Sequence, residues 1–358
     1  MSFADILQSL ERSGEQKLAA KLPSWAGVTI EVPASLNYQQ CSSESTARYK
    51  ASLLPAGARV ADLTGGLGAD SWAFSLRADQ VWYNERDAVL LEAVKKNFAA
   101  LGLSNVVFNG YDVSPESTGW QDALRAFRPD AVYLDPARRD AAGRKVFLLE
   151  DCSPDVVSLM PALLSLAAVV MVKVSPMADI TMLRRRLSGW LSELHVVGSE
   201  GECKELLCLC RRNASFRGIT LAEDGCVFPL TLRGRRRSSE ATPVSVPTDS
   251  GKLLFVPSAA MVKSGLGPGM CLMDYDERLA PFGKYWQVIE NLPFASSVIK
   301  DLGRRYPQAD VTARGVPVSS EELRKKIRTK PGGPVHIFAC ILKGERRLLI
   351  CTDRLEVQ

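Results

Sequence analysis

The sequence predicts an α/β protein in which a mostly parallel sheet is followed by a smaller α+β unit. Short runs of β-branched residues alternate with helical segments between residues 58 and 211, which is the pattern of a parallel sheet covered on both faces. A glycine-rich turn follows the first of these strands, at residues 62–70. The length of 358 residues predicts about two domains, at roughly 150 residues per domain.

The composition excludes several classes of protein. Hydrophobic residues make up 46% and charged residues 24% of the chain, which is ordinary for a globular protein and excludes a disordered, collagen-like or disulfide-stapled chain. The longest apolar stretch, residues 159–174, is interrupted by Pro161, Ser165 and Lys173 and is too short to span a bilayer. The N-terminus lacks the basic segment and apolar run of a signal peptide, so we expect a cytoplasmic protein.

Histidine and cysteine usage bears on metal and redox chemistry. The two histidines, His195 and His336, lie far apart in the sequence, so we expect no metal site. The nine cysteines form no Cys-x-x-Cys motif, and we interpret them as reduced thiols. Cys208 and Cys210 lie two residues apart in an apolar run and are expected on one face of a buried strand.

Charge is unevenly distributed along the chain. Residues 1–210 hold 21 Lys and Arg against 25 Asp and Glu, whereas residues 211–358 hold 24 against 15. An acidic front half and a basic back half indicate a catalytic half joined to a half that contacts a polyanion such as nucleic acid. The alternative is that the basic half is an ordinary solvated surface.

Residues 1–54 are expected to form a helical N-terminal segment. Its first helix is predicted over Phe3–Lys21. A second helix is predicted over Thr46–Leu54. Ser42 or Ser43 is its expected N-cap, because a hydroxyl oxygen can accept from the free N–H groups of the first turn.

Residues 55–213 carry the alternating pattern and are expected to form one domain. Its strands are predicted at Arg59–Leu63, Gln80–Asn84, Val106–Asn109, Ala131–Leu134, Ala168–Val174, Leu194–Gly198 and Glu205–Arg211. Helices are predicted between most of them, including a long amphipathic one over Asp87–Leu101. This order predicts a Rossmann-like, seven-stranded, mostly parallel sheet with helices on both faces.

Two further segments follow this domain. Residues 214–252 are expected to form a hairpin over residues 216–233, with Asp224-Gly225 as its turn signal, and then a basic, proline-containing linker. Residues 253–358 mix short strands and helices and are expected to form a small α+β domain. Within it, a helix is predicted over Ser319–Arg328.

The turn after the first strand is a candidate binding site. It reads Asp62-Leu63-Thr64-Gly65-Gly66-Leu67-Gly68-Ala69-Asp70. Glycines here let the backbone approach a ligand closely, and the following helix supplies free N–H groups. The spacing of Asp62, Gly66 and Gly68 differs from the Gly-x-Gly-x-x-Gly of dinucleotide-binding proteins.

Two acids after the next strands sharpen this prediction. Glu85 ends the second strand, 17 residues after Gly68, where a carboxylate can accept from both hydroxyls of a ribose. Asp112 follows the third strand, where it can accept from an adenine amino group. Together with Asp62, which suits an ammonium group, they indicate a site for S-adenosylmethionine. The predicted site consists of Asp62, Thr64, Gly65, Gly66, Gly68, Asp70, Glu85 and Asp112. Structural alternatives are a helix cap for Asp62, a plain turn for Gly65 and solvated loop acids for Glu85 and Asp112.

Further segments complete a family pattern. The segments that carry the pattern, in addition to the glycine turn, are residues 40–44, 46–51, 133–140, 149–152, 173–177, 201–205, 322–326 and 330–333. With these segments the sequence resembles the class I S-adenosylmethionine-dependent methyltransferases, and more narrowly a bacterial group with a C-terminal THUMP-like domain. The resemblance implies the methyltransferase fold and cofactor, a THUMP-like, ferredoxin-like unit in residues 253–358, and structured RNA as the partner of that unit.

A candidate catalytic position lies at the end of the fourth strand, in Asp135-Pro136-Ala137-Arg138. Open α/β sheets carry their chemistry at the carboxyl ends of the strands, and we expect Asp135 to accept a hydrogen bond from the substrate. The motif resembles that of base amino-methyltransferases, which carry a proline and an aromatic residue at the positions of Ala137 and Arg138. This difference argues against methylation of an exocyclic amine. Arg138 is expected to bind a phosphate or carboxylate, or else to pair with neighbouring acids.

Other residues near this edge leave alternatives open. Lys173, near the end of the fifth strand, is expected either to orient the substrate or to extend toward solvent. A covalent mechanism like that of uracil C5 methyltransferases needs a nucleophilic cysteine. Cys152 and Cys203 are the candidates, and we interpret both as buried, inert thiols.

Basic residues gather in the back half and predict contacts with RNA. They are Arg324, Lys325, Lys326, Arg328 and Lys330. The Gly332-Gly333 pair that follows can cradle a phosphate. The leading hypothesis is a cytoplasmic methyltransferase of tRNA or rRNA. The alternatives are a methyltransferase of a protein or small anionic metabolite, and a non-catalytic RNA-binding protein with a vestigial Rossmann domain.

Overall fold

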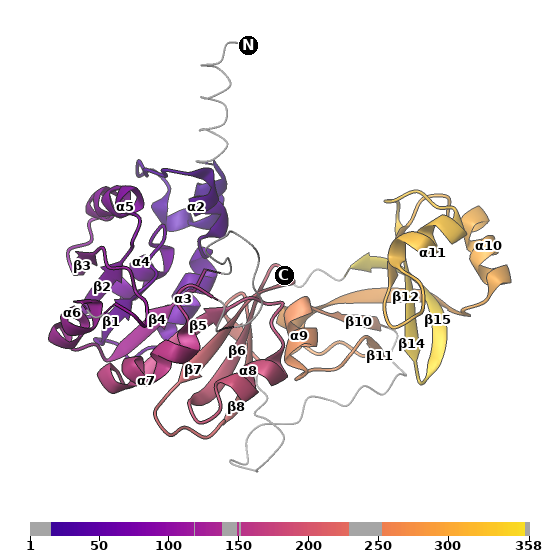
Figure 1. Ribbon diagram of the computed structural model, residues 1–358. Helices are drawn as coiled ribbons and strands as arrows, with labels where there is room; N and C mark the ends of the chain where they lie inside the picture. The colour runs from indigo at the N-terminus through magenta and orange to yellow at the C-terminus, as the bar shows by residue number, and fades with distance from the viewer. Residues whose placement is uncertain (1–15, 118, 138–148, 150–151, 229–252, 355–358) are drawn as a thin grey trace, which may run out of the picture. The chain divides into compact units, whose positions relative to one another are not determined.

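The computed structural model describes residues 16–117, 119–137, 149, 152–228 and 253–354 (Figure 1). These residues divide into two compact units. One falls within Met1–Ser199 and Lys204–Ile219, and the other within Glu200–Cys203 and Thr220–Gln358. No helix in these ranges combines the length and the apolar character that crossing a bilayer requires.

The first unit is built on the predicted Rossmann-like sheet. Its strands are β1 (Arg59–Asp62), β2 (Gln80–Asn84), β3 (Val106–Asn109), β4 (Ala131–Leu134), β5 (Val169–Val174), β6 (Leu191–Ser199) and β7 (Glu202–Cys210). The pairs in the order β3-β2-β1-β4-β5 are parallel, and β7 runs antiparallel to β5. All seven predicted strands are present. The hairpin of β8 (Gly218–Glu223) and β9 (Cys226–Val227) extends the sheet to nine strands.

Helices cover both faces of this sheet (Figure 1). They are α4 (Ala69–Ser75), α5 (Ala88–Ala100), α6 (Gly119–Phe127), α7 (Val156–Leu166) and α8 (Ile180–Arg186). Right-handed crossovers in this strand order place α4 and α5 on one face and α6 and α7 on the other. The order reverses between β1 and β4, and ligands of open α/β sheets bind at such a switch point.

The N-terminal segment packs against the face that carries α4 and α5. It consists of a helical turn at residues 16–21, η1 (Pro23–Trp25), α2 (Ser35–Gln40) and α3 (Glu44–Ser52). Leu22, Trp25 and Ala47 are buried in the same core as Trp72 and Phe74 of α4. Ser43 caps α3 as predicted. Most of the helix predicted over residues 3–21 lies outside the described residues.

The second unit is a six-stranded sheet with helices. Its elements are β10 (Leu253–Pro257), α9 (Ala259–Ser264), β11 (Cys271–Met273), η3 (Ala280–Phe282), β12 (Gly283–Pro293), α10 (Ser296–Arg305), β13 (Asp310–Ala313), α11 (Ser320–Ile327), β14 (Val335–Leu342) and β15 (Glu345–Arg354). The strand order is β11-β10-β12-β15-β14-β13, and only β13 and β14 pair in parallel among the described pairs. The helix predicted over Ser319–Arg328 is α11, and Ser319 is its N-cap. The predicted hairpin turn at Asp224-Gly225 is present between β8 and β9, whereas the predicted linker lies outside the described residues.

The nine cysteines are unbridged, and two of them lie in β7 as the sequence predicts. Cys208 and Cys210 are both fully buried in β7. Burial raises the pKa of Cys208 to about 12, so this thiol is protonated and inert at neutral pH.

Candidate active site

The glycine turn joins β1 to α4, and its three glycines do different things. A Cβ on Gly65 would lie 2.1 Å from Cε2 of Tyr83, and a Cβ on Gly68 would lie 2.7 Å from Cε1 of Phe98. These two glycines therefore let the turn pack tightly onto β2 and α5. Gly66 has a φ of +55°, and a Cβ there would meet no atom nearer than 4.0 Å. The turn thus presents open backbone at Gly66, where a ligand can approach closely.

Asp62 is the last residue of β1 and lies directly beneath this turn. Its side chain is buried, with the whole residue 1% exposed. Oδ1 accepts from the Thr64 N–H at 3.0 Å, and Oδ2 accepts from the Ser71 hydroxyl at 2.7 Å. Burial raises the pKa of Asp62 to about 7, although both hydrogen bonds oppose the rise. A cation beside this carboxylate would favour its charged form.

Glu85 lies against the glycine turn. The Gly66 N–H donates to Glu85 Oε2 at 3.0 Å, and the Asp87 N–H donates to Oε1 at 2.9 Å. The meeting follows from the parallel pairing of β1 and β2, whose carboxyl ends lie at one edge of the sheet. One predicted donor-site acid therefore supports the turn directly.

Asp112 lies in the loop after β3, near the same edge. The loop is tied to the end of β2, because Asn84 accepts from the Tyr111 N–H at 2.8 Å and donates to the Tyr111 carbonyl oxygen at 3.0 Å. The Asp112 side chain is 69% exposed and forms an ion pair with Arg86 at 3.4 Å. Its carboxylate thus remains accessible to a ligand from solvent.

Asp135 stands immediately after β4 and is linked to the glycine turn. Its N–H donates to the Thr64 hydroxyl oxygen at 2.6 Å. Its Oδ2 accepts from Lys173 Nζ at 2.6 Å, and its side chain is 38% exposed. Pro136 is buried, whereas Arg138 lies outside the described residues. Two of the three predicted catalytic residues are therefore placed at the carboxyl edge of the sheet.

A set of charged and polar side chains, most of them buried, extends from Asp135 into the protein, and we call it the charge network. Its members are Ser42, Lys50, Asp70, Tyr133, Asp135, Lys173 and Glu205. Asp70, predicted as a donor-site acid, belongs to it. Asp70 Oδ2 accepts from the Ser42 and Tyr133 hydroxyls at 2.9 and 2.8 Å, and Oδ1 pairs with Lys50 at 3.0 Å. Its carboxylate is thus engaged inside the protein.

Lys50 and Glu205 are the members that the sequence analysis did not select. Lys50 Nζ donates to both carboxylate oxygens of Glu205, at 2.7 and 2.9 Å. The Lys50 side chain is 0% exposed and that of Glu205 is 3% exposed. They come from α3 and β7, 155 positions apart. Both lie in segments that carry the family resemblance, which is the one signal in the sequence that points to them.

The charges of the network influence one another. Burial alone would lower the pKa of Lys173, but Asp135 and Glu205 raise it above its ordinary value. Burial likewise opposes ionisation of Asp70, yet Lys50 and Lys173 hold its pKa below its ordinary value. Burial raises the pKa of Glu205 in spite of the same two lysines. Lys173 is therefore a cation at neutral pH and is paired with Asp135.

The predicted basic residues of the second unit lie on α11 and just after it. Lys325, Lys326, Arg328 and Lys330 are exposed, and Arg324 is half-buried. Lys325 pairs with Glu321 one turn earlier, at 2.8 Å. Cys152 and Cys203, the candidates for a covalent mechanism, are half-buried rather than buried. Neither forms a hydrogen bond with Asp135 among the bonds that the structure describes.

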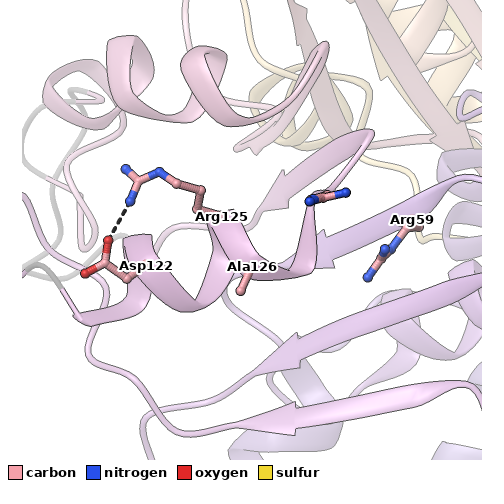
Figure 2. Close-up of a pocket in the computed structure, with 5 residues that line it drawn as sticks. Arg59, Asp122, Arg125 and Ala126 are labelled. Carbon is pink, nitrogen blue, oxygen red and sulfur yellow. Dashed lines mark hydrogen bonds and ion pairs between the residues drawn. The ribbon is translucent and has the colours of Figure 1, made fainter.

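A cavity of about 680 Å³ lies elsewhere on the first unit (Figure 2). It is lined by Arg59, Asp122, Arg125, Ala126 and Arg128. Arg59 begins β1, so this cavity lies at the amino edge of the sheet, opposite the edge where Asp62 ends the same strand. Arg125 pairs with Asp122 at 2.5 Å, and none of the predicted site residues lines the cavity.

Comparison with known proteins agrees with the fold and with the C-terminal unit. Residues 283–353 match the family model of THUMP domain-like proteins. A crystal structure of a candidate methyltransferase from Porphyromonas gingivalis W83 is 29% identical, covers 96% of this chain and 88% of its own, and superposes with a TM-score of 0.75. No curated protein sequence matches the chain significantly.

Other solved structures match only about half of the chain. An rRNA methylase from Streptococcus thermophilus is 12% identical over 51% of this chain and 98% of its own, with a TM-score of 0.32. A Streptococcus mutans protein crystallised with SAH is 13% identical over 51% of this chain and 99% of its own, with a TM-score of 0.34.

The first unit thus has a Rossmann-like fold with a candidate site at the carboxyl edge of its sheet. The chain as a whole is similar to a candidate methyltransferase and combines this unit with a C-terminal THUMP-like α+β unit.

Proposed function

We propose that this chain is an S-adenosylmethionine-dependent methyltransferase that acts on RNA. The observation that carries the proposal is the meeting of the glycine turn with Asp62, Glu85 and Asp135 at one edge of the sheet. The similarity to a candidate methyltransferase over nearly the whole chain supports it.

The donor site would consist of Asp62, the backbone at Gly66, Glu85 and Asp112. These residues fit a cationic donor, because open backbone at Gly66 lies beside a buried carboxylate that a cation would stabilise. When bound, S-adenosylmethionine supplies an electrophilic methyl group on a sulfonium. Glu85 fixes the turn through the Gly66 N–H, and Asp112 remains exposed for a further polar contact.

The acceptor would be oriented by Asp135. Lys173 occupies Oδ2 of this carboxylate, and among the described residues no group donates to Oδ1. Oδ1 can therefore accept one hydrogen bond from an N–H or O–H of the acceptor. Thr64 ties the backbone of Asp135 to the glycine turn, which fixes the acceptor relative to the donor. Alignment of this kind supplies most of what methyl transfer needs.

RNA is the proposed acceptor because of the second unit. Its exposed cations Lys325, Lys326, Arg328 and Lys330 gather around the end of α11, and cations gathered in this way bind phosphates. The match of residues 283–353 to THUMP domain-like proteins supports the same interpretation. The natural role of that cluster would be capture of a structured RNA.

Calorimetric titration with S-adenosylmethionine tests the donor site. The wild-type chain is expected to bind, and Glu85→Ala is expected to weaken binding at least about tenfold, because one lost charge-assisted hydrogen bond is worth about 1.5–3 kcal/mol. Glu92→Ala, on the exposed side of α5 with a 64% exposed side chain, is the matched control. Absence of heat with the wild-type chain would refute the proposal.

Transfer of labelled methyl groups to fractionated RNA, protein and metabolites tests the acceptor. Label is expected in RNA and is expected to be lost with Asp135→Ala. If the label appeared only in protein or only in small molecules, that fraction and not RNA would contain the acceptor. Binding of the donor without transfer to any fraction would support a non-catalytic role.

A further inference from the structure

The charge network places two cations and three acids in or near the core of the first unit. Lys50 and Lys173 are the cations, and Asp70, Asp135 and Glu205 are the acids. They come from a helix of the N-terminal segment, from α4, from the residue that follows β4, and from strands β5 and β7. Segments that lie far apart in the sequence therefore converge behind one residue of the candidate site.

Stability does not account for this arrangement. Removing an ion from water costs several kcal/mol even in a real protein, and replacing a buried ion pair by apolar residues often leaves stability unchanged or raises it. The Lys50–Glu205 pair is nearly inaccessible to solvent, with side chains 0% and 3% exposed. A buried pair of this kind is better explained by the geometry that it enforces.

Exposure increases step by step through the network. The side chains of Lys50 and Glu205 are inaccessible, that of Lys173 is 15% exposed, and that of Asp135 is 38% exposed. Glu205 Oε2 lies 4.0 Å from Lys173 Nζ, which in turn lies 2.6 Å from Asp135 Oδ2. The network thus has its one well-exposed end at Asp135.

Lys50 is itself held by three other groups. Ser42 accepts from its ammonium at 2.8 Å, Glu205 binds it through both oxygens, and Asp70 lies 3.0 Å away. Its three N–H donors are directed at the Ser42 hydroxyl and at both oxygens of Glu205, which leaves this ammonium a single orientation. Glu205 is thereby fixed on the side that faces Lys173.

We propose that Lys50, Glu205 and Lys173 are positioning residues for Asp135. Glu205, fixed by Lys50, holds the ammonium of Lys173, and Lys173 holds the Asp135 carboxylate with Oδ1 turned toward the acceptor. Helix α3 of the N-terminal segment then contributes to the acceptor site through Lys50. The role of Asp135 in this inference rests on the proposed function, whereas the positioning itself does not.

A carbon-13 carboxyl titration of Asp135 in the full chain, assigned with Asp135→Asn, tests the positioning without a substrate. Lys173→Met is expected to raise the protonation midpoint of Asp135 by at least about one pH unit, a tenfold change in proton affinity. Lys173→Arg keeps the charge and is expected to restore at least half of that shift. A midpoint unchanged in Lys173→Met would overturn the proposal.

The nearly isosteric variant Glu205→Gln separates positioning from simple electrostatics. Loss of a nearby carboxylate alone would lower the midpoint of Asp135, because like charges raise each other's pKa. Release of Lys173 would raise it instead. We therefore expect a rise, and a fall or no change would overturn the role of Glu205. Glu92→Gln, on the exposed side of α5, is the control and is expected to leave the midpoint unchanged.

Enzymatic readouts complete the test with Lys50→Met/Glu205→Gln, which removes one charge of each sign. Donor affinity by calorimetry is expected to stay within about twofold of wild type, while kcat for methyl transfer falls at least about tenfold. An unchanged kcat in a folded double variant would count against the inference. Failure of the proposed function would show separately, as a wild-type chain that neither binds the donor nor transfers methyl groups, and the titration would still decide the positioning.

Discussion

Replacing Asp62 by asparagine should make the first unit more stable, and increasingly so as the pH rises. The carboxyl is buried, and burial raises its pKa from 3.8 to about 7. Asparagine keeps an acceptor oxygen for the Thr64 N–H, and the Ser71 hydroxyl, which now donates to Oδ2, can accept from the new amide instead. The substitution therefore removes a titratable group while preserving its local hydrogen bonds.

The sign of the effect follows from proton binding. Between pH 3.8 and about 7, the folded chain retains a proton on Asp62 that the unfolded chain has lost, so the free energy of unfolding of the wild type falls as the pH rises. At about 1.4 kcal/mol for each pH unit between the two pKa values, the penalty reaches about 4 kcal/mol above pH 7. Asp62→Asn is free of this penalty.

Thermal unfolding followed by tryptophan fluorescence at a series of pH values measures the difference. Trp286 is the one tryptophan of the six beyond residue 219, so the signal reports mainly the first unit. The Tm of Asp62→Asn relative to wild type is expected to rise by about 10 °C between pH 4 and pH 8, at roughly 2–4 °C per kcal/mol. Asp122→Asn, whose side chain is 78% exposed, should show no such trend. A Tm difference that does not change with pH would refute the reasoning.

Three further predictions concern the turn, the donor and the basic cluster. Gly65→Ala should destabilise the first unit by about 1–3 kcal/mol, because its Cβ would lie 2.1 Å from Tyr83. Urea unfolding beside Gly119→Ala, whose Cβ meets nothing nearer than 3.9 Å, checks this, and equal stabilities would contradict it. Donor affinity should rise as the pH passes about 7, where Asp62 ionises; calorimetry showing a flat profile would exclude Asp62 from the donor site. Lys325→Gln/Lys326→Gln/Arg328→Gln should lower the salt slope of RNA binding by about 2–3, and an unchanged slope in a filter-binding assay would place the RNA elsewhere.

Much of the fold was predictable because its signals are local and periodic. The amphipathic run after Asp87 predicts a helix, and the structure places α5 at Ala88–Ala100 with Asp87 accepting from two N–H groups of its first turn. The alternation of short strands with helices predicts the parallel order of β1 to β5. The two added strands, β8 and β9, were expected as a hairpin, but nothing local to a hairpin states which sheet it joins.

The candidate site was predictable where it follows from that order. Asp62, Glu85 and Asp135 end parallel neighbours, and the carboxyl ends of parallel strands share one edge. The Lys50–Glu205 pair follows from no such rule, because it joins a helix that precedes the sheet to an antiparallel strand 155 positions later. The direction of Asp70 was equally hidden, since a residue in the first turn of α4 can face either the glycine turn or the interior. Lys173 had two open interpretations, and the structure pairs its ammonium with Asp135, with 15% of the side chain exposed.

The contact between Gly66 and Glu85 also bears on which nucleotide-like ligand the turn can take. In dinucleotide-binding proteins the glycine turn and the helix N-terminus offer their N–H groups to a pyrophosphate. Here the Gly66 N–H already donates to a carboxylate, at 3.0 Å. A phosphate at that position would meet the negative charge of Glu85 and, just beneath the turn, the carboxyl of Asp62. Both acids disfavour a phosphate at the turn, and they favour a cationic ligand once Asp62 is ionised. The departure from the dinucleotide spacing seen in the sequence therefore agrees with the cationic donor that we propose.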